Sequence, residues 1–361
     1  MFELTNEQRK CFALVPVEEN WKRVKIKASN FDSFETYIYY EGNIIRKCII
    51  TSEIEYSEYE LCEKISDDGK YLLPKTAKGK PVLLSSSNLL KRNSIGMVLS
   101  FSHRFVVLYN STTQCSYYSM RYENSDISDI KEFENWVLNW CNETTEEDIK
   151  DIENFSKRPR RHIKYNEGDV FRFKIDRRLY GYGRIILDFD KMRKEKIEFW
   201  NVLMSKPLIC SVFHILTERT DVTVDELKKI KSLPSTIIAD NNLFYGEYEI
   251  IGNIPLAENE DFPIMYGKSI EIGKNSICLQ YGKVFREIEN GELLYDGFRK
   301  NSVSFSLNFH KKVLLNCIKL NSNEPYWKEY YQHFVNSDLR NPKFKKEINE
   351  ICKQMGVILN S

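Results

Sequence analysis

Residues 168–187 read Gly-Asp-Val-Phe-Arg-Phe-Lys-Ile-Asp-Arg-Arg-Leu-Tyr-Gly-Tyr-Gly-Arg-Ile-Ile-Leu, and the two strands that this segment predicts are central to the second half of the chain. Apolar and charged residues alternate along its first half, which predicts a half-buried strand with Phe171 and Phe173 on the inner face. A second strand follows, with Gly181 and Gly183 at alternate positions. Such glycines remove side chains from one face, so that another backbone or a partner can approach closely. The stretch therefore predicts a β-hairpin.

The same hairpin supplies a candidate partner-binding surface. Its turn, Asp176–Arg178, is polar and lacks the Asn-Gly pair of a tight hairpin, which predicts a longer loop. Tyrosine and arginine are enriched at the energetic centres of protein interfaces. We expect an exposed aromatic and basic patch made of Arg177, Arg178, Tyr180, Tyr182 and Arg184. The alternative is that the stretch is only the opening hairpin of a small β-barrel.

Size and composition indicate a globular protein of two domains. The chain has 361 residues, of which 42% are hydrophobic and 29% charged. The formal net charge of +1 offers no overall field for DNA, RNA or an anionic membrane, so direct nucleic-acid binding is not expected. No apolar run is long enough for a membrane span, and the first residues do not resemble a signal peptide.

Nine cysteines are scattered along the chain, and none forms a Cys-x-x-Cys pair. Most lie within apolar runs, which is typical of reduced, buried thiols in a cytoplasmic protein. The five histidines lack the spacing of metal ligands, and there is no nucleophile elbow, phosphate-binding glycine loop or dinucleotide fingerprint. We therefore predict no catalytic residue, metal or cofactor, although a site assembled in three dimensions would escape such a search.

The predicted fold class is α+β. It consists of two β-rich domains, the second a strongly bent sheet or small barrel, joined by an acidic helical segment and followed by a helical tail. The predicted divisions are a β-rich N-terminal domain (1–122), an acidic helical connector (123–157), a second β-rich domain (158–300) and a helical C-terminal segment (301–361).

Several helix signals support this division. Thr5 with Gln8, Thr144 with Glu147, and Thr223 with Glu226 each have the spacing of a capping box. Apolar residues recur at helical spacing over 129–142. In the tail, the aromatic residues of 327–335 fall on one predicted helix face, and a last helix begins at Asn341-Pro342 and stops at Gly356.

Two stretches of the chain are strongly acidic. Residues 123–154 contain eleven acids against two bases, and residues 53–68 contain seven acids against one base. The simpler interpretation of 123–154 is a solvated pair of helices whose charge is partly balanced by the basic segment 157–164. The alternative is a docking surface for a basic protein, with Glu146, Glu147, Asp148 and Asp151 as candidate contacts.

Two motifs resemble a known family. Glu167-Gly-Asp-Val-Phe-Arg-Phe173 followed by Tyr180-Gly-Tyr-Gly-Arg-Ile185 resembles the signature of the immunity protein 26 family of bacterial polymorphic toxin systems. Phe244-Tyr-Gly-Glu-Tyr-Glu-Ile-Ile-Gly252, predicted to be a strand to Ile251, is similar to the second landmark of that family. The signature leaves the first 120 residues uncovered, and Arg177-Arg178 occupy a turn that is commonly shorter and less basic in the family.

The resemblance implies a cytoplasmic protein that binds and neutralises a cognate toxin without catalysis. Many such toxins are basic nucleases. The acidic segments 53–68 and 123–154 would then steer the association with the toxin or mimic its nucleic-acid substrate. Some members of the family carry a phosphotriesterase label, so a metal-dependent phosphotriester hydrolase is the competing hypothesis, although this chain lacks clustered ligands in its linear sequence. A ligand-sensing regulatory module is a third possibility.

Overall fold

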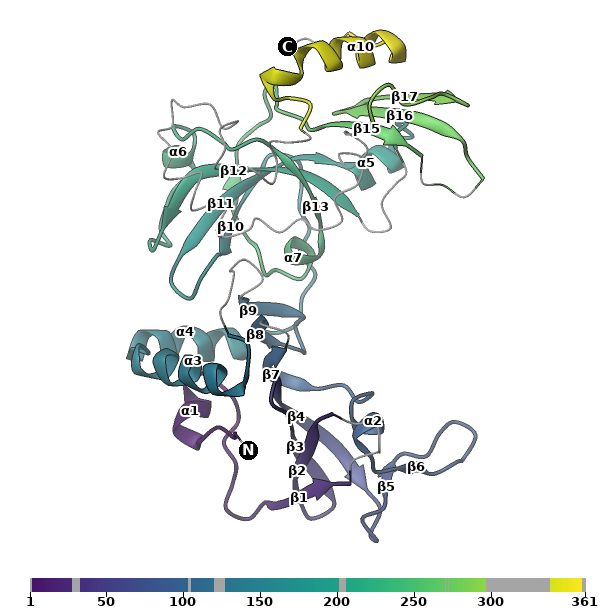
Figure 1. Cartoon of the computed structure of the whole chain (residues 1–361). Helices are drawn as coiled ribbons and strands as arrows, with labels where there is room; N and C mark the ends of the chain where they lie inside the picture. Colours follow the sequence, from purple (N-terminus) through teal and green to yellow (C-terminus); the bar gives the residue numbers. More distant parts are fainter. Residues whose placement is uncertain are drawn as a thin grey trace. The chain divides into compact units, whose positions relative to one another are not determined.

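The computed structural model describes residues 2–27, 33–102, 105–119, 127–200, 206–269, 271, 273–296 and 338–358. It divides into two compact units, Met1–Arg161 and His162–Ser361 (Figure 1). Three β-sheets and several helices make up the two units, which confirms the predicted α+β class. The acidic helices belong to the first unit.

The first unit is built on a nine-stranded antiparallel sheet with the order β1-β2-β3-β4-β7-β8-β9, from which β5 and β6 branch at β4. Its strands are β1 (Lys22–Ile26), β2 (Glu35–Glu41), β3 (Ile44–Thr51), β4 (Glu55–Ile65), β5 (Tyr71–Leu73), β6 (Val82–Leu83), β7 (Ile95–Ser102), β8 (Phe105–Asn110) and β9 (Cys115–Ser119). Apart from β4 and β7, between which β5, β6 and a short helix intervene, neighbouring strands of the main path follow one another directly in sequence, as expected for a meander of hairpins.

Each face of this sheet carries its own core. On one face, Phe133 of α3 stacks on Phe101 of β7 at 4.9 Å, and Phe12 stacks on Trp140 at 5.7 Å. The helices on this face are α1 (Asn6–Lys10), α3 (Ile130–Asn142) and α4 (Glu146–Ser156) (Figure 1). An aliphatic cluster that includes Ile38, Val98 and Leu89 of α2 (Ser86–Leu89) covers the other face.

The helix signals in the first unit are largely confirmed. Thr5 and Gln8 form the predicted capping box. The periodic segment 129–142 forms α3, with Asp129 as its N-cap. The prediction for α4 was wrong by one residue, because Thr145 and Asp148 form the capping box in place of Thr144 and Glu147. Both pairs have the required spacing, so the sequence motif alone could not choose between them.

The second unit contains a five-stranded antiparallel sheet with the order β13-β12-β11-β10-β14. Its strands are β10 (Asp169–Lys174), β11 (Tyr180–Asp188), β12 (Pro207–Thr217), β13 (Thr236–Ala239) and β14 (Glu249–Asn253). The hairpin of β10 and β11 forms as predicted, with a connection longer than two residues. The hydrogen-bonded order of the described strands ends at β13 and β14, so closure into a barrel is not confirmed.

Short helices flank this sheet: α5 (Phe189–Lys194), α6 (Val224–Leu227) and α7 (Asn241–Phe244). Thr223 and Glu226 form the predicted capping box at the start of α6. The predicted strand Phe244–Ile251 was wrong in its first half, because Phe244 ends α7 and Gly246 adopts a left-handed conformation with φ of 76°. Gly246 supplies that conformation at little cost, and the chain becomes extended only at Glu249.

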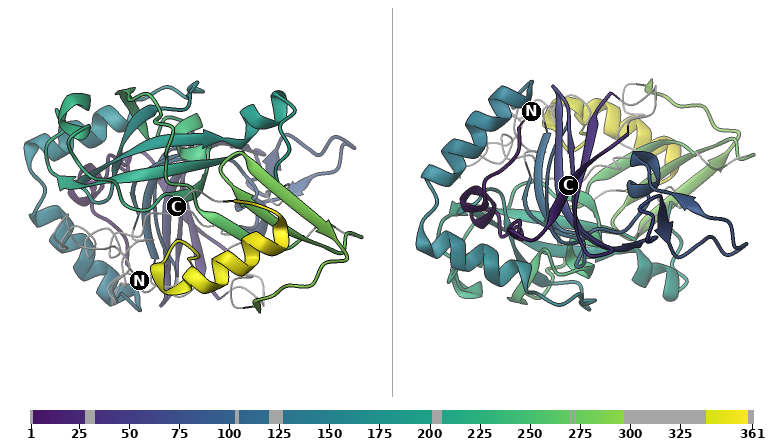
Figure 2. Two further views of the ribbon diagram at one scale, coloured as in Figure 1. Left: turned by 90° about the horizontal axis from the view of Figure 1, so that it is seen from above. Right: turned by 90° about the horizontal axis from the view of Figure 1, so that it is seen from below.

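A three-stranded sheet completes the described part of the second unit. Its strands are β15 (Ile264–Lys268), β16 (Ser276–Tyr281) and β17 (Val284–Glu289). The helix α10 (Lys345–Met355) lies across this sheet, where Ile351 and Met355 pack against Tyr266 and Leu279 (Figures 1 and 2).

The end of the tail follows the prediction. Asn341 caps the 3₁₀ turn η4 (Pro342–Phe344) that leads into α10, and Gly356 ends the helix in a left-handed conformation. The tail segment predicted from residues 327–335 lies outside the described residues.

The cysteines in the described residues differ in their burial. Cys48, Cys115, Cys210 and Cys278 are buried, whereas Cys62 is exposed. Burial raises the pKa of Cys48 and of Cys278 to about 12, so these two thiols stay protonated near neutral pH.

Candidate functional site

The glycines of the hairpin signature are matched to phenylalanines on the neighbouring strand. Phe171 of β10 lies opposite Gly183 of β11, and Phe173 lies opposite Gly181. A Cβ atom at 183 would lie 2.5 Å from Phe171 Cζ, and one at 181 would lie 2.7 Å from Phe173 Cζ. The space that the glycines leave is therefore filled by the two rings and is not open to a partner.

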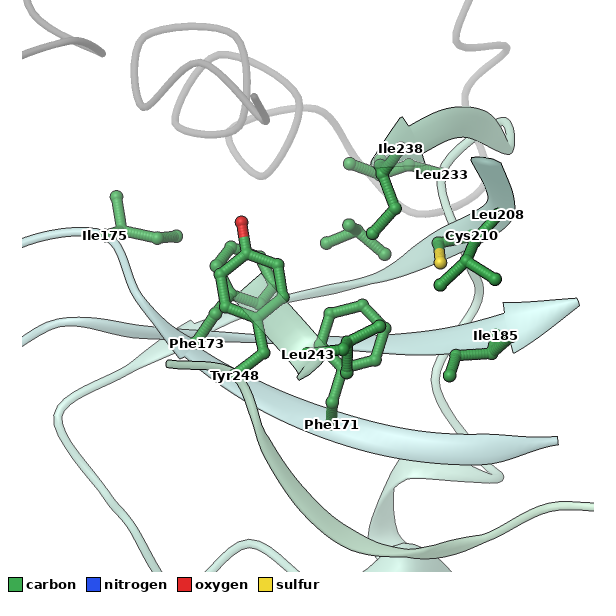
Figure 3. Close-up of a cluster of buried hydrophobic side chains, with 11 residues drawn as sticks. Phe171, Phe173, Ile175, Ile185, Leu208, Cys210, Leu233, Ile238, Leu243 and Tyr248 are labelled. Carbon is green, nitrogen blue, oxygen red and sulfur yellow. The ribbon is translucent and has the colours of Figure 1, made fainter. Parts of the chain in front are cut away.

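These rings belong to a buried cluster on one face of the five-stranded sheet (Figure 3). Tyr248 stacks on Phe171 with ring centroids 5.3 Å apart and nearly parallel planes. Tyr248 comes from the second motif of the family resemblance. The two motifs, of which the first ends at Ile185 and the second begins at Phe244, thus meet in one core.

Tyr182 faces the opposite side of the sheet and is fully buried. It packs with Val170, Phe213 and Leu227, and its hydroxyl donates to the carbonyl of Arg219 at 2.8 Å. Burial raises its pKa above the ordinary value for tyrosine. The expectation that Tyr182 is exposed was wrong, because α6 and the loop before it cover this face.

Arg184 holds a loop against the sheet. Its guanidinium donates to the Glu260 carboxylate and, at 3.5 Å, to the carbonyl of Pro255. Glu260 also accepts from the backbone N–H of Ala257 at 2.8 Å. Both charged side chains are largely buried, with 14% and 9% of their surface exposed. Arg184 therefore anchors residues 255–260 to the sheet. The prediction that it lies on an exposed surface was wrong.

The remaining candidates, at the turn of the hairpin, differ in their exposure to solvent. Arg177 is buried, contrary to expectation, and its carbonyl accepts from Lys174 Nζ at 3.3 Å. Arg178 is exposed, and Tyr180 is half-buried. The Arg172 guanidinium lies 5.3 Å from the centre of the Tyr180 ring, within cation–π range. Of the five residues proposed for the patch, Arg178 and Tyr180 are those that the structure leaves accessible.

The four acidic candidates on α4 also separate into two pairs. Glu146 and Glu147 are exposed in the first turn of the helix. Asp148 is buried and accepts from the backbone N–H of Thr145 at 2.8 Å as part of the cap. Asp151 accepts from the Tyr117 hydroxyl at 2.9 Å. Asp148 and Asp151 thus have structural partners within the unit, and Glu146 and Glu147 point to solvent.

The acidic segment 53–68 contains a buried charge network that sequence analysis missed. Glu58 is fully buried and accepts from Arg9 Nε at 2.7 Å, Lys47 Nζ at 2.5 Å and the Tyr56 hydroxyl at 2.6 Å. Burial would raise the pKa of Glu58, but Lys47 and Arg9 more than offset it, so the pKa lies below its ordinary value. Tyr56 and Glu58 are two residues apart and therefore share one face of β4. This spacing was the sequence signal that could have indicated a buried carboxylate.

A second group of carboxylates lies near the end of β11. The Tyr165 hydroxyl donates to Asp240 at 2.8 Å, and the side chain of Asp188 caps α5. Burial raises the pKa of both Asp188 and Asp240. Such shifts are common at functional sites but also occur in structural networks. Within the described ranges, no three or more His, Cys, Asp or Glu residues are arranged to hold a metal ion.

Comparison with protein-family models finds a similarity in part of the second unit, to a family of immunity proteins. The matching family model is described as Immunity protein 26, and it covers residues 166–278, which include the whole five-stranded sheet and β15. The match confirms the resemblance seen in the two motifs.

No curated protein and no solved structure matches the chain. None of the helices in the described residues is long and apolar enough to span a membrane. The matched family supports an immunity role in general. The burial of the signature residues leaves Arg178 and Tyr180 as the accessible members of the predicted patch.

Proposed function

We propose that the chain is a cytoplasmic immunity protein that binds a cognate toxin and neutralises it by covering the active site. The observation that carries this proposal is the match of residues 166–278 to the immunity protein 26 family. The match supports an immunity role in general and favours a non-enzymatic one. Inhibition of this kind requires a rigid, complementary surface and no catalytic residue.

We further propose that the toxin is a nuclease. A nuclease presents cations to the phosphates of its substrate, so exposed carboxylates on the inhibitor complement it. Glu146 and Glu147 are exposed at the start of α4 and fit this role. Arg178 and Tyr180 form the second candidate contact, on the hairpin of the matched segment.

The test has two steps. The tagged full-length chain is used to capture its partner from its native cells, and the captured toxin is then expressed with and without the chain. Rescue of growth, with formation of a stoichiometric complex, is the expected result. A chain that neither binds the toxin nor restores growth would contradict the proposal.

Charge reversal then tests the acidic contact. The double variant E146K/E147K is expected to weaken toxin binding at least tenfold, since both carboxylates would become like charges against a basic surface. The matched control reverses two exposed acids of the second unit, in E195K/E258K. If both variants bind the toxin equally well, Glu146 and Glu147 are not part of the interface.

The competing hydrolase hypothesis has a direct assay. Purified protein is incubated with an aryl phosphotriester and Zn²⁺ or Co²⁺, with D188N/D240N as the control for activity at the carboxylate group near β11. Metal-dependent turnover that the control variant abolishes would favour the enzyme. Specific binding of a small molecule, without a protein partner, would instead favour the ligand-sensing module.

A further inference from the structure

A two-stranded arm branches from the sheet of the first unit. It consists of β5 and β6, which pair with each other, and only β5 also pairs with β4 in the described residues. The tip of the arm, residues 74–81, is exposed at every position. Figure 1 shows this loop projecting beyond the rest of the sheet.

Hydrogen bonds hold the tip in one conformation. The Thr76 N–H donates to the Lys80 carbonyl at 2.9 Å, and the Gly79 N–H donates to the Thr76 carbonyl at 2.7 Å. The Thr76 side chain accepts from the Lys80 N–H at 3.0 Å. Gly79 adopts a left-handed conformation with φ of 74°, which closes the turn without steric cost. The arm is therefore a preformed projection, which lowers the entropic cost of binding.

The charge of the arm has one sign. Its tip carries Lys75, Lys78 and Lys80, and the surrounding stretch 69–122 contains eight Lys and Arg residues and no Asp or Glu. Neighbouring cations pair with acids from β4 and the turn after it: Lys70 lies 3.9 Å from Asp68 and Arg92 lies 3.4 Å from Glu63. The three tip lysines take part in no ion pair within the part of the chain that the structure describes.

We propose that the β5–β6 arm binds the phosphate backbone of double-stranded nucleic acid without sequence preference. Lysine ammonium groups are compact point charges that bind phosphate without fixed geometry. Paired strands lie about 4.8 Å apart, so a two-stranded ribbon fits the major groove of B-DNA, which is about 12 Å wide. The tip has no arginine and no aromatic residue, so it lacks the groups that usually read or stack on bases.

This proposal differs from the expectation drawn from net charge. The first unit contains 23 Lys and Arg against 25 Asp and Glu, so an average over the unit hides the acid-free stretch. The acidic helices α3 and α4 lie on the opposite side of the first unit from the arm in both figures. Their separation reduces the repulsion of a phosphate backbone bound at the tip.

The test measures binding of the full chain to a fluorescent 20-base-pair duplex of arbitrary sequence by anisotropy. Three phosphate contacts predict a slope of about −2.7 for log K against log salt, or about a 40-fold loss of affinity between 50 and 200 mM salt. The variant K75Q/K78Q/K80Q should bind at least tenfold more weakly at 50 mM salt. The control K157Q/R161Q/K164Q removes three exposed cations outside the arm and should retain binding within twofold.

The proposal would be overturned by no binding at 50 mM salt, or by equal loss in the arm and control variants. Tighter binding of a glutamate-rich peptide than of the duplex, through the same lysines, would also overturn it and would indicate an acidic protein partner. The single variant K78E repeats the test at the centre of the exposed tip, and circular dichroism verifies that each variant is folded.

Discussion

Phe171 and Gly183 face each other across β10 and β11, and the ring of Phe171 occupies the space that a side chain at 183 would need. Phe173 and Gly181 repeat the relationship two residues away. The most distinctive motif of the chain is therefore a packing device. Its phenylalanines and glycines specify one register of the hairpin, because a slip by one residue would turn every side chain to the other face.

The first prediction concerns this interlock, the packing of the Phe171 ring against Gly183. Gly183→Ala places a methyl group 2.5 Å from Phe171 Cζ and 2.9 Å from the backbone oxygen of Ser211. Overpacking of this kind typically costs about 1–3 kcal/mol. We expect the midpoint of urea unfolding to fall accordingly. Adding Phe171→Leu should recover part of the loss if the ring is the main obstacle, and a purely additive double variant would contradict the interlock.

The second prediction concerns Arg184 and Glu260. Removing one partner of a buried ion pair leaves the other charge uncompensated, which typically costs about 3–5 kcal/mol. We therefore expect Arg184→Gln to be strongly destabilising in denaturant unfolding. The double variant R184Q/E260Q should be less destabilised than R184Q alone, because no isolated charge remains. If R184Q unfolds like the wild type but fails to bind toxin, Arg184 is a contact residue and not an anchor.

Much of the fold could be predicted from the sequence where local patterns agree with tertiary packing. The hairpin of β10 and β11 and the amphipathic helix α3 follow directly from periodicity. The capping boxes at Thr5 and Thr223 mark the starts of α1 and α6. At α7 the prediction failed, because the run from Phe244 looks like a strand and only the turn at Gly246 divides it.

The candidate site was harder to predict, since exposure depends on elements distant in sequence. Tyr182 and Arg184 alternate with glycines as an exposed strand face would. The loop 255–260 and the residues around α6 cover that face, however, and they come from later parts of the chain, as the contact of Arg184 with Glu260 shows. Likewise, Glu58 lies in an acidic run, and its cations Arg9 and Lys47 come from α1 and β3. Charge counts along the sequence cannot contain this information.

The third prediction separates structure from binding on α4. Asp148→Ala removes the carboxylate that accepts from the Thr145 N–H, and loss of such a cap costs about 1 kcal/mol. Glu146→Ala changes an exposed side chain and should alter stability by less than about 0.5 kcal/mol. Thermal unfolding of the two variants compares these effects. Equal destabilisation would show that Glu146 also has a structural partner.

The fourth prediction uses the buried Glu58. Its pKa is held below the ordinary value of 4.5 by Lys47 and Arg9. In the unfolded chain Glu58 takes up a proton near that ordinary value, whereas in the folded protein it stays ionised to lower pH. Its stabilising contribution is therefore fully present above pH 4.5, and it is lost as the pH falls through the folded pKa.

Glu58→Gln removes this contribution and leaves two buried cations without their carboxylate, so we expect a loss of about 3–5 kcal/mol at pH 7. The difference in unfolding free energy between wild type and E58Q should shrink as the pH is lowered from 4.5. Glu146→Gln, which neutralises an exposed acid of the same unit, serves as the control and should show little difference at any pH. A difference in unfolding free energy between wild type and E58Q that stayed constant down to pH 2.5 would contradict this prediction, because the contribution of Glu58 would then not depend on its ionisation.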